Sequence, residues 1–138
     1  MIQFTPHMQY EEYALEIAKT VSKKSKDPWR KVGACVLRHD NSIASVGYNG
    51  FTAGMPEDWS DRDKRRLFVI HAEQNALRYV SPNECGLIAV TTLPCNDCLK
   101  AIASYGIKRV VYEDSYEFDS STESIAKKFG IELRKITC

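Results

Sequence analysis

The sequence predicts a single α/β domain, with helices on both faces of one sheet. Two observations lead to this prediction. The chain has 138 residues, which is the size of one ordinary domain. Its predicted elements run helix, hairpin, and then helix and strand in alternation, which is typical of a sheet covered by helices. That order predicts an antiparallel first pair of strands and mostly parallel pairing after it, while strand order stays open.

The first predicted element is a helix over residues 8–24. Apolar residues such as Ala14, Ile17 and Val21 recur there at helical spacing. Thr5 is placed to cap this helix, with Pro6 in its first turn. The Asp27-Pro28 pair should end the helix, because the residue before a proline avoids helical geometry.

A hairpin and a long loop are predicted next. Residues 32–37 and 43–48 are strand-like, and the polar residues 38–42 between them are typical of a hairpin turn. Residues 49–66 form a polar stretch with two glycines and a proline. Loops of this length in compact domains are often functional.

The second half of the chain alternates between helices and strands. Helices are predicted at residues 71–79, 95–105 and 121–129, and strands at 87–92, 108–112 and 131–136.

Composition excludes several classes of protein. Hydrophobic residues make up 43% and charged residues 27%, as in folded globular chains, and the net charge of +1 argues against a chain that mainly coats nucleic acid. No run approaches the 18 apolar residues of a membrane span, and residues 1–10 lack an apolar signal core. We therefore expect a cytoplasmic protein. In a reducing compartment, five cysteines with one Cys-x-x-Cys pair favour metal or redox chemistry over a disulfide framework.

Two short segments carry the chemistry: His71-Ala72-Glu73 and Pro94-Cys95-Asn96-Asp97-Cys98. Each lies at the start of a predicted helix that follows an apolar run. Adjacent strand ends lie side by side, so one imidazole and two thiolates can meet around one metal ion. This donor set suits zinc and leaves the fourth position open for water. Glu73 is a poor fourth ligand but is well placed to move protons.

The pair of motifs is more specific than either half. H-x-E occurs often by chance, and a lone Cys-x-x-Cys is as often a structural or redox pair, but H-x-E followed by P-C-x-x-C is typical of zinc deaminases. The alternative is a non-catalytic module that zinc stabilises and that binds nucleotides or a protein. A closed structural site needs a fourth protein ligand, and the spacing offers none.

A basic stretch precedes the first predicted strand. Residues 19–31 contain six basic residues and one acid, a local charge of +5. Such a stretch is either a solvated helix end or a loop that faces a phosphate group.

The chain resembles the cytidine and deoxycytidylate deaminase superfamily, and within it the deoxycytidylate deaminases. The resemblance extends from about Tyr13 to Ile136. The segments that carry it are Ser25-Lys26-Asp27-Pro28, Lys31-Val32-Gly33-Ala34, Gly47-Tyr48-Asn49-Gly50-Phe51, His71-Ala72-Glu73-Gln74-Asn75-Ala76, Leu93-Pro94-Cys95-Asn96-Asp97-Cys98 and Gly106-Ile107-Lys108-Arg109-Val110-Val111-Tyr112.

The resemblance implies a three-layer α/β/α sandwich around a mixed five-stranded sheet, with residues 1–138 forming one zinc-dependent deaminase domain. It implies hydrolysis of dCMP to dUMP and ammonia, which supplies dUMP for thymidylate synthesis. His71, Cys95 and Cys98 are then expected to hold one Zn²⁺ ion. Zinc hydroxide would attack C4 of cytosine, and Glu73 would protonate N3 and help ammonia leave.

Further contacts follow from the same resemblance. The Ala72 backbone N–H is expected to bind the pyrimidine carbonyl and Asn49 the deoxyribose. Tyr116 is expected near the substrate pocket. Lys26 and Trp29 are expected near the 5′-phosphate, a role that the local basic charge supports independently.

Regulation is also implied by the resemblance. Members of this family are usually hexamers that dCTP with Mg²⁺ activates and dTTP inhibits. The corresponding effector residues here are Asn41, Gly47, Gly50, Phe51 and Arg65. The charges of residues 57–66 sum to zero, so the basic residues there either meet a triphosphate or pair with neighbouring acids.

The same zinc chemistry also serves other substrates. A deaminase of a free nucleoside, of dCTP or of a base in RNA would carry the same two motifs, because the pocket selects the substrate. The near-neutral charge disfavours the nucleic-acid version and predicts no nucleic-acid or membrane partner.

Overall fold

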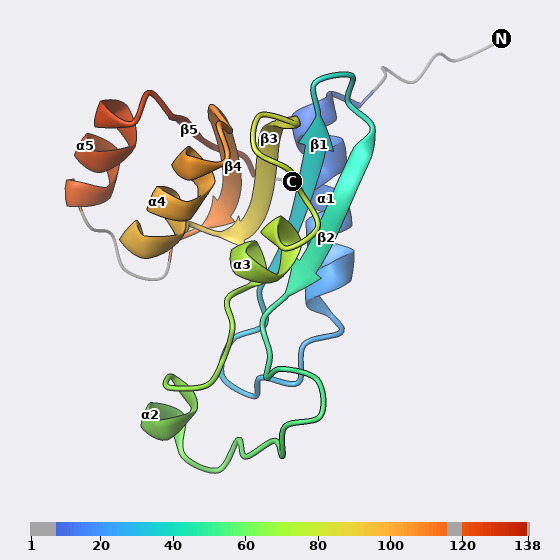
Figure 1. The fold of residues 1–138 in the computed structure, drawn as a ribbon, viewed down its shortest axis with the longest axis vertical. Coiled ribbons are helices and arrows are strands. Elements are labelled where there is room, and N and C mark those ends of the chain that lie inside the picture. Colours follow the sequence, from blue (N-terminus) through green and yellow to red (C-terminus); the bar gives the residue numbers. More distant parts are fainter. Residues whose placement is uncertain (1–7, 116–119, 138) are drawn as a thin grey trace, which may run out of the picture.

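The computed structural model describes residues 8–115 and 120–137 (Figure 1). The helices are α1 (Tyr10–Ser22), α2 (Arg62–Arg65), α3 (Ala72–Leu77), α4 (Asn96–Ser104) and α5 (Ser120–Lys128). The strands are β1 (Gly33–Arg38), β2 (Ile43–Tyr48), β3 (Cys85–Thr92), β4 (Arg109–Asp114) and β5 (Glu132–Lys135). Over these described ranges, none of the helices combines the length and apolar character that crossing a membrane requires.

The five strands form one mixed sheet in the order β2-β1-β3-β4-β5. The predicted antiparallel first pair is present, and β3, β4 and β5 are parallel. Two of the three pairs beyond the hairpin are therefore parallel, as predicted, and the β1–β3 pair is the antiparallel exception. The reason is topological. The crossover through α3 joins β2 to β3, which run in the same direction, but β1 lies between these two strands and opposes both.

Helices cover both faces of the sheet, so the three-layer arrangement is confirmed. On one face α1 buries Leu15 and Ala18 against Cys35 and other sheet residues. On the other face α3, α4 and α5 pack together over the sheet, with Leu99 and Ile102 of α4 among the buried residues. In Figure 1, α1 lies behind the sheet and the other three helices lie in front of it. Burial of these apolar surfaces is the main stabilising contribution.

Several elements differ in extent from their predictions. Helix α3 (Ala72–Leu77) is shorter than the predicted residues 71–79, because His71 is its N-cap and Arg78 is already its C-cap. Helix α2 was not predicted, because its four residues are all charged and show no apolar period. The Asp61 carboxylate caps α2 by accepting hydrogen bonds from the backbone N–H groups of Asp63 and Lys64, at 2.9 and 3.0 Å. The predicted cap Thr5 and Pro6 lie outside the described residues.

Residues 50–70 project from one end of the sheet, and we call them the lobe (Figure 1). Its two ends are joined by a backbone bridge, in which Gly50 N–H donates to Ile70 O at 3.1 Å and Ile70 N–H donates to Gly50 O at 2.8 Å. Inside the lobe, the rings of Phe51 and Trp59 pack edge to face with centroids 4.6 Å apart. The lobe therefore starts and ends beside the N-terminus of α3.

Candidate active site

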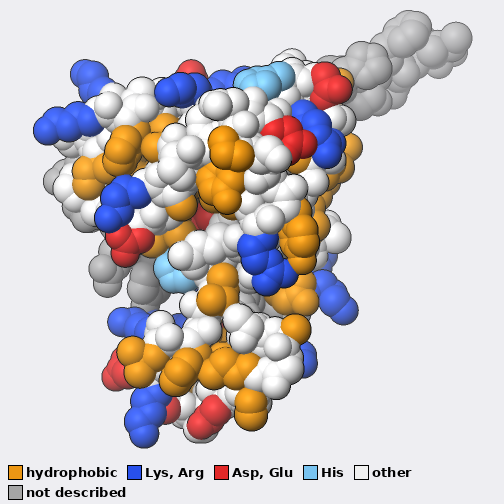
Figure 2. Space-filling view, viewed as in Figure 1, with side chains coloured by type: hydrophobic (Ala, Val, Ile, Leu, Met, Phe, Trp, Pro, Cys, Tyr) orange, Lys and Arg blue, Asp and Glu red, His pale blue; other side chains and the backbone are white. Residues whose placement is uncertain are grey.

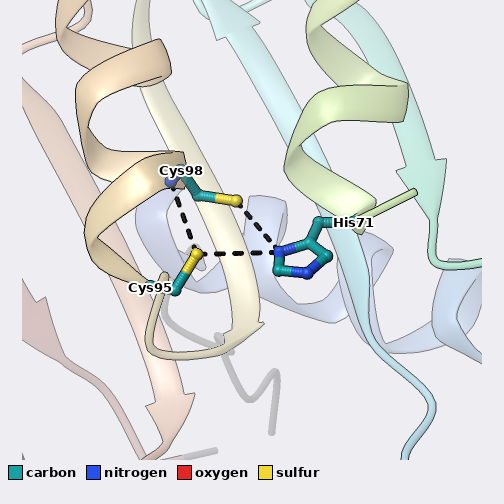
Figure 3. A group of neighbouring side chains, drawn as sticks. All are labelled: His71, Cys95 and Cys98. Atoms are coloured by element: carbon teal, nitrogen blue, oxygen red, sulfur yellow. Dashed lines mark hydrogen bonds between the residues drawn. The ribbon is translucent and has the colours of Figure 1, made fainter. Parts of the chain in front are cut away.

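Three side chains predicted to hold a metal lie together at the starts of α3 and α4 (Figure 3). His71 Nδ1 is 3.2 Å from Cys98 Sγ and 3.7 Å from Cys95 Sγ. All three ligand atoms lie within 4.8 Å of one another. One imidazole nitrogen and two sulfurs fit the donor preference of zinc. Three donors also leave a coordination position for another molecule.

Local hydrogen bonds hold these donors at the helix starts. His71 precedes α3, and its backbone N–H donates to the Gln74 side chain at 3.1 Å. Cys95 precedes α4, and its sulfur accepts a hydrogen bond from Cys98 N–H at 3.4 Å. Helix starts present N–H groups without intrahelical acceptors, so they favour negatively charged groups such as thiolates.

The surroundings of Cys95 favour its thiolate form. Hydrogen bonds from Cys98 and from His71 lower the pKa of Cys95 to about 4, against the opposing effect of burial. A hydrogen bond to Cys95 is also the largest reason why the pKa of His71 is raised. Since metals bind the thiolate, this site is prepared for a cation.

Glu73 differs from an ordinary surface carboxylate. It follows His71 by two residues and is only 4% exposed. Burial raises the pKa of its carboxyl group. A carboxyl group whose pKa is shifted towards neutrality can both accept and return a proton.

Two of the three metal donors, His71 and Cys95, line a cavity of about 450 Å³ between the body of the molecule and the lobe. Figure 2 shows the lobe as a projection below the body. The cavity is lined by motif residues and by basic and aromatic side chains. The lining residues are Asp27, Trp29, Arg30, Val32, Asn49, Arg62, Arg65, Arg66, Val69, His71, Ala72, Glu73, Thr92, Leu93 and Cys95.

The predicted substrate residues are distributed as follows. Trp29, Asn49 and Ala72 line this cavity. Lys26 is not among the lining residues, and its Nζ lies 3.1 Å from the Glu57 carboxylate instead. Tyr116 lies outside the described residues.

The Asn49 side chain is occupied by the protein itself. Its Nδ2 donates to Arg30 O at 2.9 Å and to Asp27 Oδ2 at 3.2 Å, while its Oδ1 accepts from Val32 N–H at 2.9 Å. Contact with a deoxyribose therefore stays a prediction. These hydrogen bonds connect Asn49, at the end of β2, to residues 27–32, which precede β1.

The predicted effector residues do not form one group. Asn41 lies in the β1–β2 turn, at the end of the hairpin away from the lobe (Figure 1). Gly47 lies beneath α3, where an added Cβ would meet the backbone of that helix. Gly50 and Phe51 are at the neck of the lobe, and Arg65 lines the cavity with the metal donors.

Sequence reasoning missed the role of Asp27. The sequence predicts that Asp27-Pro28 ends a helix and places Asp27 in a segment of the family resemblance, but it assigns no contact to this side chain, which is 1% exposed. It accepts hydrogen bonds from the backbone N–H groups of Trp29 and Arg30. The available signal is the Asp27-Pro28 pair itself. An Asp side chain at the start of a turn often accepts a hydrogen bond from the backbone N–H two residues further on. Of the alternatives for residues 57–66, Arg65 follows neither, since it pairs with Asp27 and not with a neighbouring acid.

Residues 8–114 match the family model described as the cytidine and deoxycytidylate deaminase zinc-binding region. The chain belongs to this family. The resemblance inferred from the motifs is thereby confirmed.

Relatives from several organisms are deoxycytidylate deaminases. The mouse (Mus musculus) enzyme is 32% identical over 146 residues, which cover 95% of this chain and 82% of the relative. The human (Homo sapiens) enzyme is 31% identical over 144 residues, which cover 94% of this chain and 80% of the relative.

Solved structures show the same architecture. The dCMP deaminase of cyanophage S-TIM5, solved in complex with dCMP and dUMP, superimposes with a TM-score of 0.81 at 31% identity. The match covers 94% of this chain and 100% of that one. Cytidine deaminase from Burkholderia pseudomallei, at 21% identity and a TM-score of 0.54, shares the fold.

Proposed function

We propose that this chain is a single-domain zinc-dependent hydrolase that converts dCMP to dUMP and ammonia. The observation that supports this most directly is the composition of one cavity. The same space of about 450 Å³ is lined both by His71, Cys95 and Glu73 and by arginines of the lobe. A cytosine ring and a 5′-phosphate require these two kinds of surface. The related cyanophage enzyme was solved with dCMP and dUMP.

The chain's own groups divide the work of the proposed reaction. His71, Cys95 and Cys98 would hold zinc, which when bound supplies a Lewis acid that lowers the pKa of water. Glu73 would take a proton from the attacking water, deliver it to N3 of cytosine, and assist the departure of ammonia. Ala72 is the first residue of α3 and lines the cavity, so its N–H is free of an intrahelical acceptor and suits the pyrimidine carbonyl.

The basic wall would bind the phosphate group. Arg30, Arg62 and Arg66 line the cavity, and guanidinium groups bind phosphate oxygens in bidentate geometry. Trp29 lines the same cavity, and 38% of its surface is exposed, so its ring is accessible to a nucleotide. Lys26 keeps its proposed role only if it exchanges Glu57 for the nucleotide.

The test is ammonia release from dCMP, CMP, deoxycytidine and dCTP, measured in parallel on zinc-loaded protein. We expect the highest kcat/KM with dCMP, because the cavity arginines would bind the phosphate that deoxycytidine lacks. Equal turnover of deoxycytidine would remove the phosphate-binding role. Release from a different cytosine substrate would assign a different deaminase, and no release from any would favour the non-catalytic zinc module.

We also propose that the enzyme is a cytoplasmic hexamer in pyrimidine metabolism, activated by dCTP with Mg²⁺ and inhibited by dTTP. The lobe supports a regulatory role, because it contains Gly50 and Phe51 and also supplies Arg65 to the cavity. A dCMP assay with each triphosphate should show opposite responses, and native mass spectrometry should give six chains. If neither triphosphate changes the rate of dCMP turnover, the proposed activity stands and the proposed regulation is wrong.

A further inference from the structure

One arginine of the lobe, Arg65, is paired with Asp27 in the segment before β1. Arg65 Nη1 lies 2.9 Å from Asp27 Oδ2, and the two side chains are 11% and 1% exposed. The Arg65 guanidinium also lies over the Trp29 ring, 5.1 Å from its centroid. By contrast, the other ion pair between these segments, Lys26 with Glu57, is largely exposed. Exposed pairs contribute little, so the buried Arg65–Asp27 pair is the stronger candidate for holding the lobe against the turn of residues 27–30.

Asp27 connects Arg65 to the rest of the cavity wall. Its Oδ1 accepts from Trp29 N–H at 2.8 Å and from Arg30 N–H at 3.1 Å. Its Oδ2, which Arg65 contacts, also accepts from Asn49 Nδ2 at 3.2 Å. One carboxylate thus holds a tight turn and joins it to the end of β2.

The connection continues towards the metal donors. Arg30 Nε donates to Thr92 Oγ1 at 3.3 Å. Thr92 is the last residue of β3, and the chain proceeds from it directly to Pro94 and Cys95. The lobe, the turn and the metal-binding loop are therefore linked by consecutive contacts.

We propose that Arg65 is a positioning residue: its ion pair with buried Asp27 fixes the lobe and the turn of residues 27–30, and so sets the width and orientation of the nucleotide-binding wall. Without Arg65, the Asp27 carboxylate loses its cation while it stays buried, which is unfavourable. The turn that it holds then loosens, and Trp29 and Arg30 move with it. The effect on catalysis rests on the proposed function. The effect of Arg65 on the turn of residues 27–30 is independent of that function.

The competing role for Arg65 is direct phosphate binding. Its Nε is buried and has no hydrogen-bond partner within the described residues, so it has a donor that a ligand could accept. The two roles differ in substrate dependence. A phosphate ligand affects only nucleotides. A positioning residue also affects a nucleoside, because Asp27 holds Asn49, the predicted deoxyribose contact, as well as the turn with Arg30.

The first experiment measures the link itself, without a substrate. Amide hydrogen exchange is followed by NMR in the zinc-bound protein, in Arg65→Gln, in Arg65→Lys and in Lys64→Gln. Lys64 is a matched control, because it is an exposed cation of the same short helix and does not line the cavity. We expect exchange at the Trp29 and Arg30 amides to accelerate about tenfold or more in Arg65→Gln. Lysine should restore part of the protection, and Lys64→Gln should leave it unchanged.

Equal protection in Arg65→Gln and Lys64→Gln would overturn the proposal. So would acceleration spread equally over the β1 and β3 amides, because that is general destabilisation.

The second experiment compares dCMP with deoxycytidine. In Arg65→Gln we expect kcat/KM to fall roughly 10- to 100-fold for both substrates, mainly through KM, since small displacements of a positioning surface have effects of this order. Bound zinc should stay at the wild-type level. Loss confined to dCMP would identify Arg65 as a phosphate ligand and overturn the positioning role. If the wild-type chain deaminates neither compound, the proposed function fails, and the exchange experiment still decides the link.

Discussion

Glu73 shows how the environment of one residue can determine its chemistry. The side chain is 4% exposed, and burial raises the pKa of its carboxyl group. Burying a carboxylate is costly, and a carboxyl group with a raised pKa beside a cavity is typical of a functional site.

Replacement of Glu73 by Gln is expected to abolish proton transfer while keeping the shape of the site. We expect turnover to fall by about 100- to 10,000-fold, the usual contribution of a general acid-base. Zinc content and the thermal midpoint should not decrease, because a neutral amide removes the cost of burying a charge. Steady-state kinetics, metal analysis and circular dichroism test this.

The matched control is Glu12→Gln, which removes an exposed carboxylate from α1, on the other face of the sheet. Activity of Glu73→Gln within a few-fold of this control would contradict the catalytic role.

The cysteines should differ sharply in reactivity. Burial raises the pKa of Cys35 to about 12 and that of Cys85 to about 11, so both are protonated at neutral pH. Cys95 is exposed, and zinc should protect it. With iodoacetamide and peptide mapping, we expect Cys95 to be alkylated only after chelation, and Cys35 and Cys85 only after unfolding. Labelling of Cys35 in folded protein as fast as Cys95 would contradict the packing.

At the scale of elements, the close approach of α3 to β2 is the contact that places His71. An added Cβ at Gly47 would lie 2.5 Å from the Ala76 nitrogen and 2.7 Å from the Ala72 oxygen. Gly47→Ala should therefore push α3 away from the sheet. We expect about 1–3 kcal/mol of lost stability, as for other overpacked sites, together with reduced activity. Urea unfolding and the dCMP assay measure both effects.

The control for this substitution is Gly86→Ala in β3. An added Cβ there meets only the exposed His39 side chain, at 3.0 Å, which can move away. If Gly47→Ala matched Gly86→Ala in stability, the tight packing of α3 on β2 would be wrong.

The elements also show which structural features a sequence can reveal. The β2 limits at residues 43–48 were predicted correctly, because a run with β-branched and aromatic residues lies there between the polar turn 38–42 and Asn49-Gly50. The metal donors were predicted because motif spacing is local. The β1–β3 pairing was not, because it depends on which side of β1 the chain passes after β2. Neither was the Asp27–Arg65 pair, since its partners are far apart in sequence and both are of a residue type that usually faces water.

For the whole molecule, zinc is expected to add to stability. Its proposed ligands come from the starts of two helices that belong to different parts of the chain, so binding would fasten α3 to α4. A ligand present at 1,000 times its Kd stabilises the folded state by about 4 kcal/mol. Chelation should therefore lower the thermal midpoint by several degrees, and one equivalent of zinc should restore it.

Cys98→Ser supplies the comparison for this measurement, because it removes one donor from the site. Its midpoint should respond much less to chelator or to added zinc. A wild-type midpoint that does not change when the bound zinc is removed would contradict a link between the metal and the fold.

The backbone bridge between Gly50 and Ile70 has a consequence for how such a molecule can diversify. The chain leaves and re-enters the body at a single neck, so insertions or deletions beyond it need not displace β2 or α3. Closing a longer segment adds only about 0.6 kcal/mol for each doubling of its length. The lobe can therefore change in length and sequence while the metal donors and Glu73 stay in place. A change of substrate size or of regulation then does not require new catalytic residues.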